Sequence, residues 1–94
     1  MIRHVVMWKF KEGTEEQMNE FLTRLQALYG VIPQIKAQQV GRDIAGGGNY
    51  DAVLVSDFES LEDLEIYRVH PRHVAVGEFM GPVRESRSCV DFEL

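Results

Sequence analysis

The stretch Ile2-Arg3-His4-Val5-Val6-Met7-Trp8-Lys9-Phe10-Lys11 predicts a β-strand whose two faces differ in character. One face gathers Ile2, His4, Val6, Trp8 and Phe10, and the other gathers Arg3, Val5, Met7, Lys9 and Lys11. The first face is mostly large and apolar, so we expect it to lie against helices, with His4 as its polar exception. The second face carries Val5 and Met7, which a monomer with a single helical layer would leave exposed. The stretch therefore predicts that a second covering surface, other than the helical layer, lies against this face.

The residues that follow predict a helix and then a weaker strand. Apolar residues recur at three- and four-residue spacing through residues 15–29, which predicts a helix. Thr14 and Gln17 are placed to form a capping box at its start, and Gly30 is placed to end it. Residues 35–44 predict a strand whose diluted pattern favours an edge position. The glycines at 46–48 lack the lysine and the following helix of a phosphate-binding loop, so we interpret them as a hairpin connection.

The second half of the chain repeats the order of strand, helix and strand. Residues 50–58 are the most apolar strand candidate, and the continuous run suggests burial on both faces. Ser60 is placed to cap a second helix. Pro71 predicts a corner near His70, with a new short helix beginning at once, and residues 84–93 predict the last strand.

The resulting order, β-α-β-β-α-β, indicates an α+β class and a ferredoxin-like fold. Such a fold is a four-stranded antiparallel sheet with its helices on one face, and it leaves the other face bare. A second copy packed on the bare face would cover it and give a dimeric α/β barrel. The sequence therefore predicts a homodimer formed through the open sheet face.

Composition limits the class of protein. Residues 1–94 are enough for one domain, and we expect a single one. The net charge of −5 disfavours nucleic acid, and no apolar run approaches the roughly 20 residues that span a membrane. The N-terminus reads as a strand rather than a signal peptide, and Cys89 is the single cysteine, so we expect a cytoplasmic location.

Chemistry-bearing residues gather in the stretch Tyr67-Arg68-Val69-His70-Pro71-Arg72-His73. Imidazole and phenol together can move a proton and polarise a carbonyl near neutral pH. The same residues also have a purely structural interpretation, because a histidine beside a proline corner often caps a helix and a tyrosine often lies in the core. Spacing alone favours the structural interpretation and leaves the chemical one open.

Several short motifs spread along the chain resemble the stress-responsive A/B barrel domain, or Dabb, family of the dimeric α/β barrel superfamily. They are Ile2-Arg3-His4-Val5-Val6, Phe10-Lys11, Ile32-Pro33, Asn49-Tyr50-Asp51, Asp57-Phe58-Glu59-Ser60, Tyr67, His70-Pro71-Arg72-His73-Val74 and Asp91-Phe92. The His-Pro-x-His-Val element and the histidine-bearing first strand are fairly specific together and weak singly. The resemblance covers nearly the whole chain.

The resemblance implies a possible reaction and a set of site residues. Most members of the family have no settled activity, but a plant member is a cofactor-free polyketide cyclase. Its catalytic histidine falls on His73 and its catalytic tyrosine on Tyr67, while His4 and His70 also match histidines of that enzyme. Trp8 shares the face of His4, so we add it as a binding residue. In some family members, main-chain carbonyls just after the first helix hold a cation. The resemblance implies that the corresponding carbonyls here belong to Tyr29, Ile32 and Ile35.

We therefore expect a pocket between sheet and helices, of roughly 300 Å³ or more, for a small apolar or phenolic ligand. His73 would be the base and Tyr67 the acid in chemistry on a polyketide-like or β-dicarbonyl substrate, and no cofactor is needed. A zinc site is disfavoured, because no cysteine or carboxylate completes a recognised spacing around His70 and His73. A non-catalytic stress-response or ligand-binding protein and a cofactor-free monooxygenase remain the alternatives.

Overall fold

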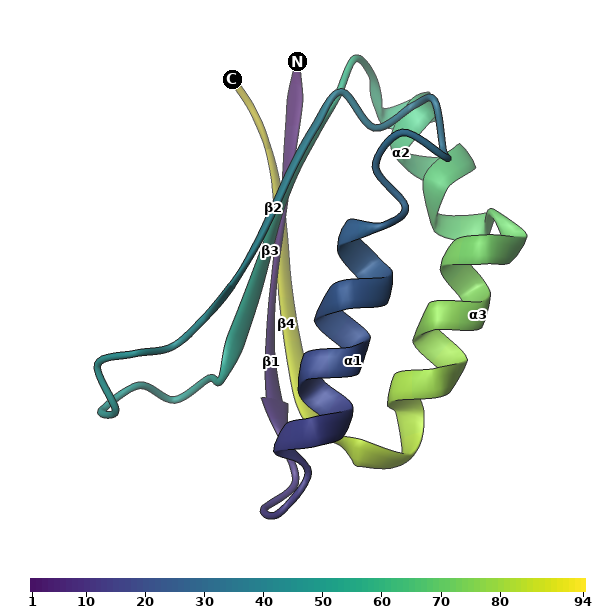
Figure 1. The fold of residues 1–94 in the computed structure, drawn as a ribbon. Coiled ribbons are helices and arrows are strands. Elements are labelled where there is room, and N and C mark those ends of the chain that lie inside the picture. Colours follow the sequence, from purple (N-terminus) through teal and green to yellow (C-terminus); the bar gives the residue numbers. More distant parts are fainter.

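Four antiparallel strands form one sheet, and all of the helices lie against the same face of it (Figure 1). The computed structural model describes residues 1–94. The elements in chain order are β1 (Ile2–Phe10), α1 (Glu15–Gln26), β2 (Ala37–Arg42), β3 (Ala52–Phe58), α2 (Leu61–Val69), α3 (Pro71–Met80), a 3₁₀ turn (Gly81–Val83) and β4 (Arg84–Glu93).

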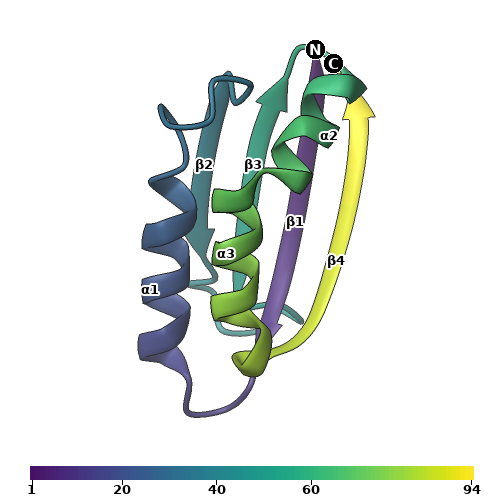
Figure 2. The same cartoon turned by 90° about the vertical axis from the view of Figure 1, so that its right-hand side faces the viewer.

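The strands lie in the order β2-β3-β1-β4, with every neighbouring pair antiparallel (Figure 2). Strands β1 and β3 are central, and β2 and β4 form the two edges. This is the ferredoxin-like arrangement, and the predicted α+β fold class is confirmed. The corner at Pro71 divides the second helical segment into α2 and α3, as the proline predicted. None of the helices has the length and apolar composition needed to cross a bilayer.

The core lies between the sheet and the helices. Along β1 every second residue is buried, beginning with Ile2, and the residues between them are half-buried. Met18, Phe21, Leu22 and Leu25 pack onto this face from α1. His4 is as buried as its apolar neighbours, at 3 % exposed, so the polar exception in the strand pattern lies inside the core.

The two predicted helix caps differ in outcome. The Ser60 hydroxyl accepts a hydrogen bond from the Asp63 backbone N–H at 3.1 Å, as predicted. The predicted capping role of Thr14 is wrong, because its hydroxyl donates to the Lys11 carbonyl at 2.6 Å and caps no N–H. The preceding turn brings that carbonyl within reach of the hydroxyl. Helix α1 also ends at Gln26, three residues before the predicted end.

The predicted β2 and β3 are longer than the observed strands. Strand β2 covers Ala37–Arg42 rather than 35–44, and it is an edge strand as expected. Strand β3 begins at Ala52 rather than at residue 50, and its residues alternate between buried and half-buried up to Val55. The predicted burial of both faces is therefore not met within one chain. The glycines at 46–48 lie in the β2–β3 connection, where Gly46 has φ +79°.

The face of the sheet away from the helices is apolar at its centre. Strand register places Val90, Val5, Val55 and Gln39 in one row, and Ser88, Met7, Val53 and Gly41 in the next row. Val90 and Phe92 on β4 are 55 % and 44 % exposed. In Figure 1 this face carries no helix, and the β2–β3 connection projects beside it.

An ion pair lies at one end of the open face. Arg3 on β1 donates two hydrogen bonds to the Asp57 carboxylate on β3, at 2.8 and 2.9 Å. These hydrogen bonds, together with the charge of Arg3, hold the pKa of Asp57 below its ordinary value.

Replacing Asp57 with asparagine should lower the thermal unfolding midpoint at pH 7, because Arg3 would lose its charged partner. The folded-state pKa of Asp57 is depressed, so its contribution is present above the unfolded value of about 3.9 and is lost as the pH falls further. Melting curves of both proteins from pH 7 to pH 3 should therefore converge at the acid end. If the difference in unfolding midpoint between the two proteins stayed constant with pH, packing and not charge would distinguish the two side chains.

Candidate functional site

The corner between α2 and α3 sets the positions of the predicted site residues. His70 has extended backbone (φ −61°, ψ 132°), and its Nδ1 accepts a hydrogen bond from the Arg72 backbone N–H at 3.1 Å. Pro71 then occupies the first position of α3. Tyr67 in the last turn of α2 and His73 in the first turn of α3 consequently pack against each other, with ring centroids 4.2 Å apart and ring planes tilted by 40°.

A cavity of about 330 Å³ lies between the sheet and the helices beside this pair. The predicted residues His4, Trp8, Tyr67 and His73 all line it. The rest of the lining consists of Val6, Phe21, Leu25, Leu54, Arg68, Val76, Gly77, Met80, Arg84 and Arg87. His70 is absent from the lining, because its ring faces the first turn of α3, where it caps the helix.

Two residues that line the cavity each carry a buried hydrogen-bond donor without a partner. The Tyr67 hydroxyl and the Trp8 indole Nε1 are buried, and neither forms a hydrogen bond within the protein. Tyr67 is 0 % exposed and Trp8 is 4 % exposed. An unsatisfied buried donor costs about 1–3 kcal/mol, so these two donors are an unfavourable feature of the folded protein as it stands.

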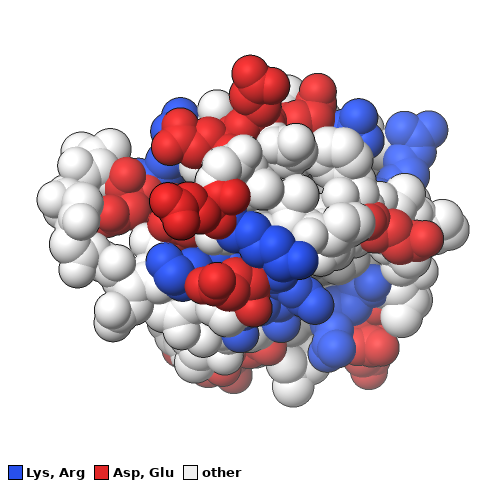
Figure 3. Space-filling view, turned by 90° about the horizontal axis from the view of Figure 1, so that it is seen from below, with Lys and Arg blue, Asp and Glu red and all other residues white.

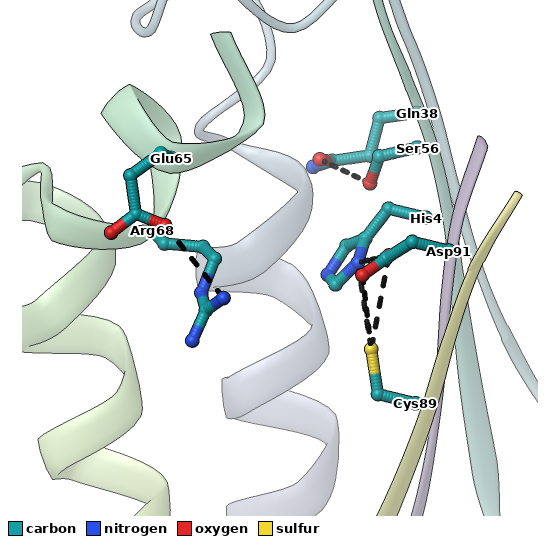
Figure 4. Close-up of polar contacts among 7 residues, drawn as sticks. All are labelled: His4, Gln38, Ser56, Glu65, Arg68, Cys89 and Asp91. Atoms are coloured by element: carbon teal, nitrogen blue, oxygen red, sulfur yellow. Dashed lines mark hydrogen bonds and ion pairs between the residues drawn. The ribbon is translucent and has the colours of Figure 1, made fainter. Parts of the chain in front are cut away.

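His4 is held by a carboxylate. Its Nδ1 lies 2.5 Å from Oδ1 of Asp91, the residue directly opposite it on β4 (Figure 4). A carboxylate only accepts hydrogen bonds, so Nδ1 carries the hydrogen and Nε2 is left unprotonated in the neutral ring. Burial lowers the pKa of His4, and the Asp91 carboxylate opposes this shift.

His73 is held by a main-chain carbonyl. Its Nδ1 donates to the Arg68 carbonyl oxygen at 3.0 Å, which leaves Nε2 as an acceptor. Burial lowers the pKa of His73, although the hydrogen bond to the Arg68 carbonyl opposes it. The charges of His4, Arg87 and Arg68 lower it further. His73 is therefore a neutral imidazole near neutral pH, able to accept a proton.

The cavity wall contains donors and cations but no carboxylate. Burial raises the pKa of Tyr67 well above its ordinary value, so the phenol remains a donor. Arg68, Arg84 and Arg87 line the cavity, and neither Arg84 nor Arg87 forms an ion pair. This wall suits a molecule rich in oxygen acceptors or carrying negative charge.

The other large hollows lack this combination of groups. One, of about 460 Å³, lies at the lower end of the molecule among Lys9, Lys11, Arg42, Asp51 and Glu85. Figure 3 shows that end of the surface, where basic and acidic side chains interleave. Two further hollows, of about 480 and 660 Å³, lie beside the β2–β3 connection and between α1 and β2. Neither of these two is lined by a histidine.

Sequence reasoning missed the residues that β4 and α2 bring to the site. Asp91, Arg87 and Arg68 were not predicted as site residues. The available signal was the alternation of β4, which puts residues 87, 89 and 91 on one face. That face can be identified only once the register pairs His4 with Asp91.

A model of the family described as the stress responsive A/B barrel domain, Dabb, matches residues 2–94. The chain belongs to this family. The family resemblance drawn from the sequence motifs is thereby confirmed.

Two curated proteins and one solved structure are similar to this chain. Olivetolic acid cyclase from Cannabis sativa is 33% identical over 97% of the chain and 94% of its own length. Stress-response A/B barrel domain-containing protein HS1 from Arabidopsis thaliana is 31% identical over 78% of the chain and 71% of its own length. A dimeric protein of unknown function with a ferredoxin-like fold, from Bacteroides fragilis, superposes with a TM-score of 0.91 at 35% identity. That superposition covers 99% of this chain and 95% of the other.

Proposed function

We propose that this Dabb protein is a homodimer that binds a small, oxygen-rich organic molecule in the cavity beneath its helices. We further propose that His73 and Tyr67 carry out cofactor-independent acid–base chemistry on it. The substrate class is a polyketide-like or β-dicarbonyl compound. The observation that carries the proposal is the pair of unpartnered buried donors, Tyr67 Oη and Trp8 Nε1, on two residues that line the same cavity as His73.

The proposed reaction begins with proton transfer from carbon. Nε2 of neutral His73 takes the proton from a carbon between two carbonyls, and the C–H electron pair moves into an enolate. The Tyr67 hydroxyl donates a hydrogen bond to the oxygen on which negative charge develops. The enolate carbon then attacks a second carbonyl of the same molecule, forming a C–C bond and an alkoxide. The alkoxide takes up the proton held on His73.

The remaining groups in the wall would orient the substrate. Trp8 Nε1 would donate to a second substrate oxygen, and Arg87 would attract the negative charge of the enolate. His4, fixed by Asp91, would form one side of the binding site. His70 has no part in the proposal, because it caps α3 outside the cavity. The similarity to olivetolic acid cyclase supports this choice of substrate class.

Binding without chemistry is the second candidate function. The unpartnered donors and the cavity would be explained equally well by a carrier or sensor of the same ligand class, and the similarity to protein HS1 supports a stress-response role. A third candidate, cofactor-free oxygenation of a phenolic molecule in the same cavity, would also use His73 as base. Turnover experiments separate these candidates.

Replacing His73 with glutamine should lower turnover in a screen of β-dicarbonyl and polyketide thioester substrates by roughly 10²–10⁴-fold, the usual contribution of a general base. Arg72→Gln is the matched control, because Arg72 lies one residue away on α3, is exposed, and does not line the cavity. Product formation is measured by chromatography with mass detection. Equal turnover in native protein and His73→Gln would remove the catalytic role, and ligand binding without turnover in either would favour the carrier.

The pH dependence gives a second test of the same residue. Since burial and the nearby charges lower the pKa of His73, kcat/KM should rise with pH through a midpoint below about 6.5 and then stay level. No fall is expected in the moderately alkaline range, because the pKa of Tyr67 is raised. If kcat/KM rose with a midpoint well above pH 6.5, a group other than His73 would be the base.

A further inference from the structure

A second group of reactive side chains shares His4 with the cavity wall and extends from it to the edge of the sheet. His4 on β1 is directly opposite Asp91 on β4, and Cys89 precedes Asp91 by two residues. Because residues two apart on a strand share a face, all three side chains extend to the helix-facing side of the sheet. Figure 4 shows them converging, with the Cys89 sulfur below the ring and the carboxylate.

The distances between the ligand atoms resemble the edges of a metal coordination polyhedron. His4 Nδ1 lies 3.6 Å from Cys89 Sγ, and Cys89 Sγ lies 3.9 Å from Asp91 Oδ1. In a tetrahedral zinc site with bonds of ~2.0–2.3 Å, neighbouring ligand atoms are about 3.4–3.6 Å apart. His4 Nδ1 and Asp91 Oδ1 are closer, at 2.5 Å, and would have to separate by about 1 Å.

We propose that His4, Cys89 and Asp91 form a binding site for one zinc-like divalent transition-metal ion, with a fourth coordination position left for water. A nitrogen, a thiolate sulfur and a carboxylate oxygen form a ligand set that suits zinc, whereas magnesium and calcium prefer oxygen alone. The negative charges of thiolate and carboxylate would together balance the charge of a divalent ion. On binding, the His4 hydrogen would move from Nδ1 to Nε2 so that Nδ1 can ligate, and the Cys89 thiol would release its proton to solvent. The hydrogen bond between His4 and Asp91 would be exchanged for two metal–ligand bonds.

The site is accessible to a metal ion. Strand β4 is at the edge of the sheet, Cys89 is exposed, and the Asp91 side chain is 33% exposed, whereas His4 is buried. A metal ion could therefore reach Cys89 and Asp91 from solvent. The buried His4 ring would then complete its set of protein ligands. Strand pairing, not spacing along the chain, brings these three ligands together, so the spacing around His70 and His73 could not reveal this site.

Metal titration tests this site without any substrate, so its result is independent of the proposed acid–base chemistry. Metal-free protein kept reduced is titrated with Co²⁺, and absorbance is followed in the visible range and in the near-ultraviolet thiolate-to-metal band. Zn²⁺ affinity is then measured by competition. We expect saturation at one ion per chain, with a thiolate band that Zn²⁺ abolishes.

Two variants assign the ligands. Cys89→Ser should abolish the thiolate band and weaken Zn²⁺ binding by roughly tenfold or more, since loss of even an outer-shell partner has effects of that size. Asp91→Asn should weaken Zn²⁺ binding similarly while keeping the band. Glu85→Gln, which removes another carboxylate of β4, should bind like the native protein. Circular dichroism shows whether each variant is folded, and His4→Gln provides a third ligand variant if either of the others is not. Absence of saturable binding, or native affinity in Cys89→Ser, would overturn the proposal.

Discussion

A glutamate in place of Val5 should convert the protein from a dimer of twice 10.8 kDa into a monomer at micromolar concentration. Val5 lies on a central strand, in the row of the open face that also contains Val90 and Val55. In a dimer formed through this face, an unpaired carboxylate there would lose its water. The association constant should fall by roughly 100-fold or more, which corresponds to about 2.7 kcal/mol.

Symmetry increases the effect of this substitution. A two-fold dimer uses the same patch on both copies, so one substitution places two like charges in the interface. The folded monomer should survive, because Val5 is only half-buried within one chain and the core lies on the opposite side of the sheet. The protein from Bacteroides fragilis that shares this fold is dimeric, which supports the expectation that two copies of this chain associate.

Sedimentation velocity over a concentration series measures the change. Val74→Glu is the matched control, because it introduces the same charge at a valine that is 43 % exposed on α3, away from the open face. The control should sediment like the native protein. If native protein is monomeric, or if Val5→Glu stays dimeric with an unchanged constant, the open face is not the interface.

The strands were predictable where the sequence carries a local signal, which is alternation in β1 and an apolar run in β3. The first strand shows this most clearly, since the buried positions beginning at Ile2 are those that alternation predicted. The cap at Ser60 was predictable for the same reason, because the side chain and the N–H it satisfies are three residues apart. Thr14 has the same local pattern, yet the turn before it offers the Lys11 carbonyl as a competing partner for its hydroxyl.

The candidate site was predictable only in part, because its groups come from distant elements. Tyr67 and His73 lie in one short stretch, so a helical corner was enough to bring them together. Asp91 is 87 residues from His4, and only the β1–β4 register makes them partners. Arg84 and Arg87 could not be predicted as part of the wall, because exposed charged residues on an edge strand are ordinary features of a sequence.

Replacing Tyr67 with phenylalanine should stabilise the ligand-free protein and weaken ligand binding at the same time. The Tyr67 hydroxyl is buried without a partner, so its removal should raise the free energy of unfolding by about 1 kcal/mol. In a domain of this size that raises the melting temperature by roughly 4–8 °C. The ring itself, packed on His73 and Phe58, is retained.

Turnover by Tyr67→Phe should fall, although its stability rises. If the hydroxyl donates to the oxygen on which charge develops, its removal should reduce turnover by roughly 10²–10³-fold, as for other donors in such positions. A residue of purely structural importance would lower stability and activity together. A gain of stability with a loss of activity is therefore the signature of a group that is kept unsatisfied so that it can bind a substrate.

The other two tyrosines supply matched controls. Tyr50 Oη lies 2.6 Å from the Ser88 hydroxyl, so Tyr50→Phe should destabilise the protein by about 1 kcal/mol. Tyr29 is 49% exposed, and its hydroxyl is 3.5 Å from the Lys36 carbonyl, so Tyr29→Phe should change stability little. Calorimetry of the three variants, with and without ligand, measures all of these effects. A destabilised Tyr67→Phe would show that its hydroxyl is already satisfied in the folded protein, and the argument for a bound molecule would fail with it.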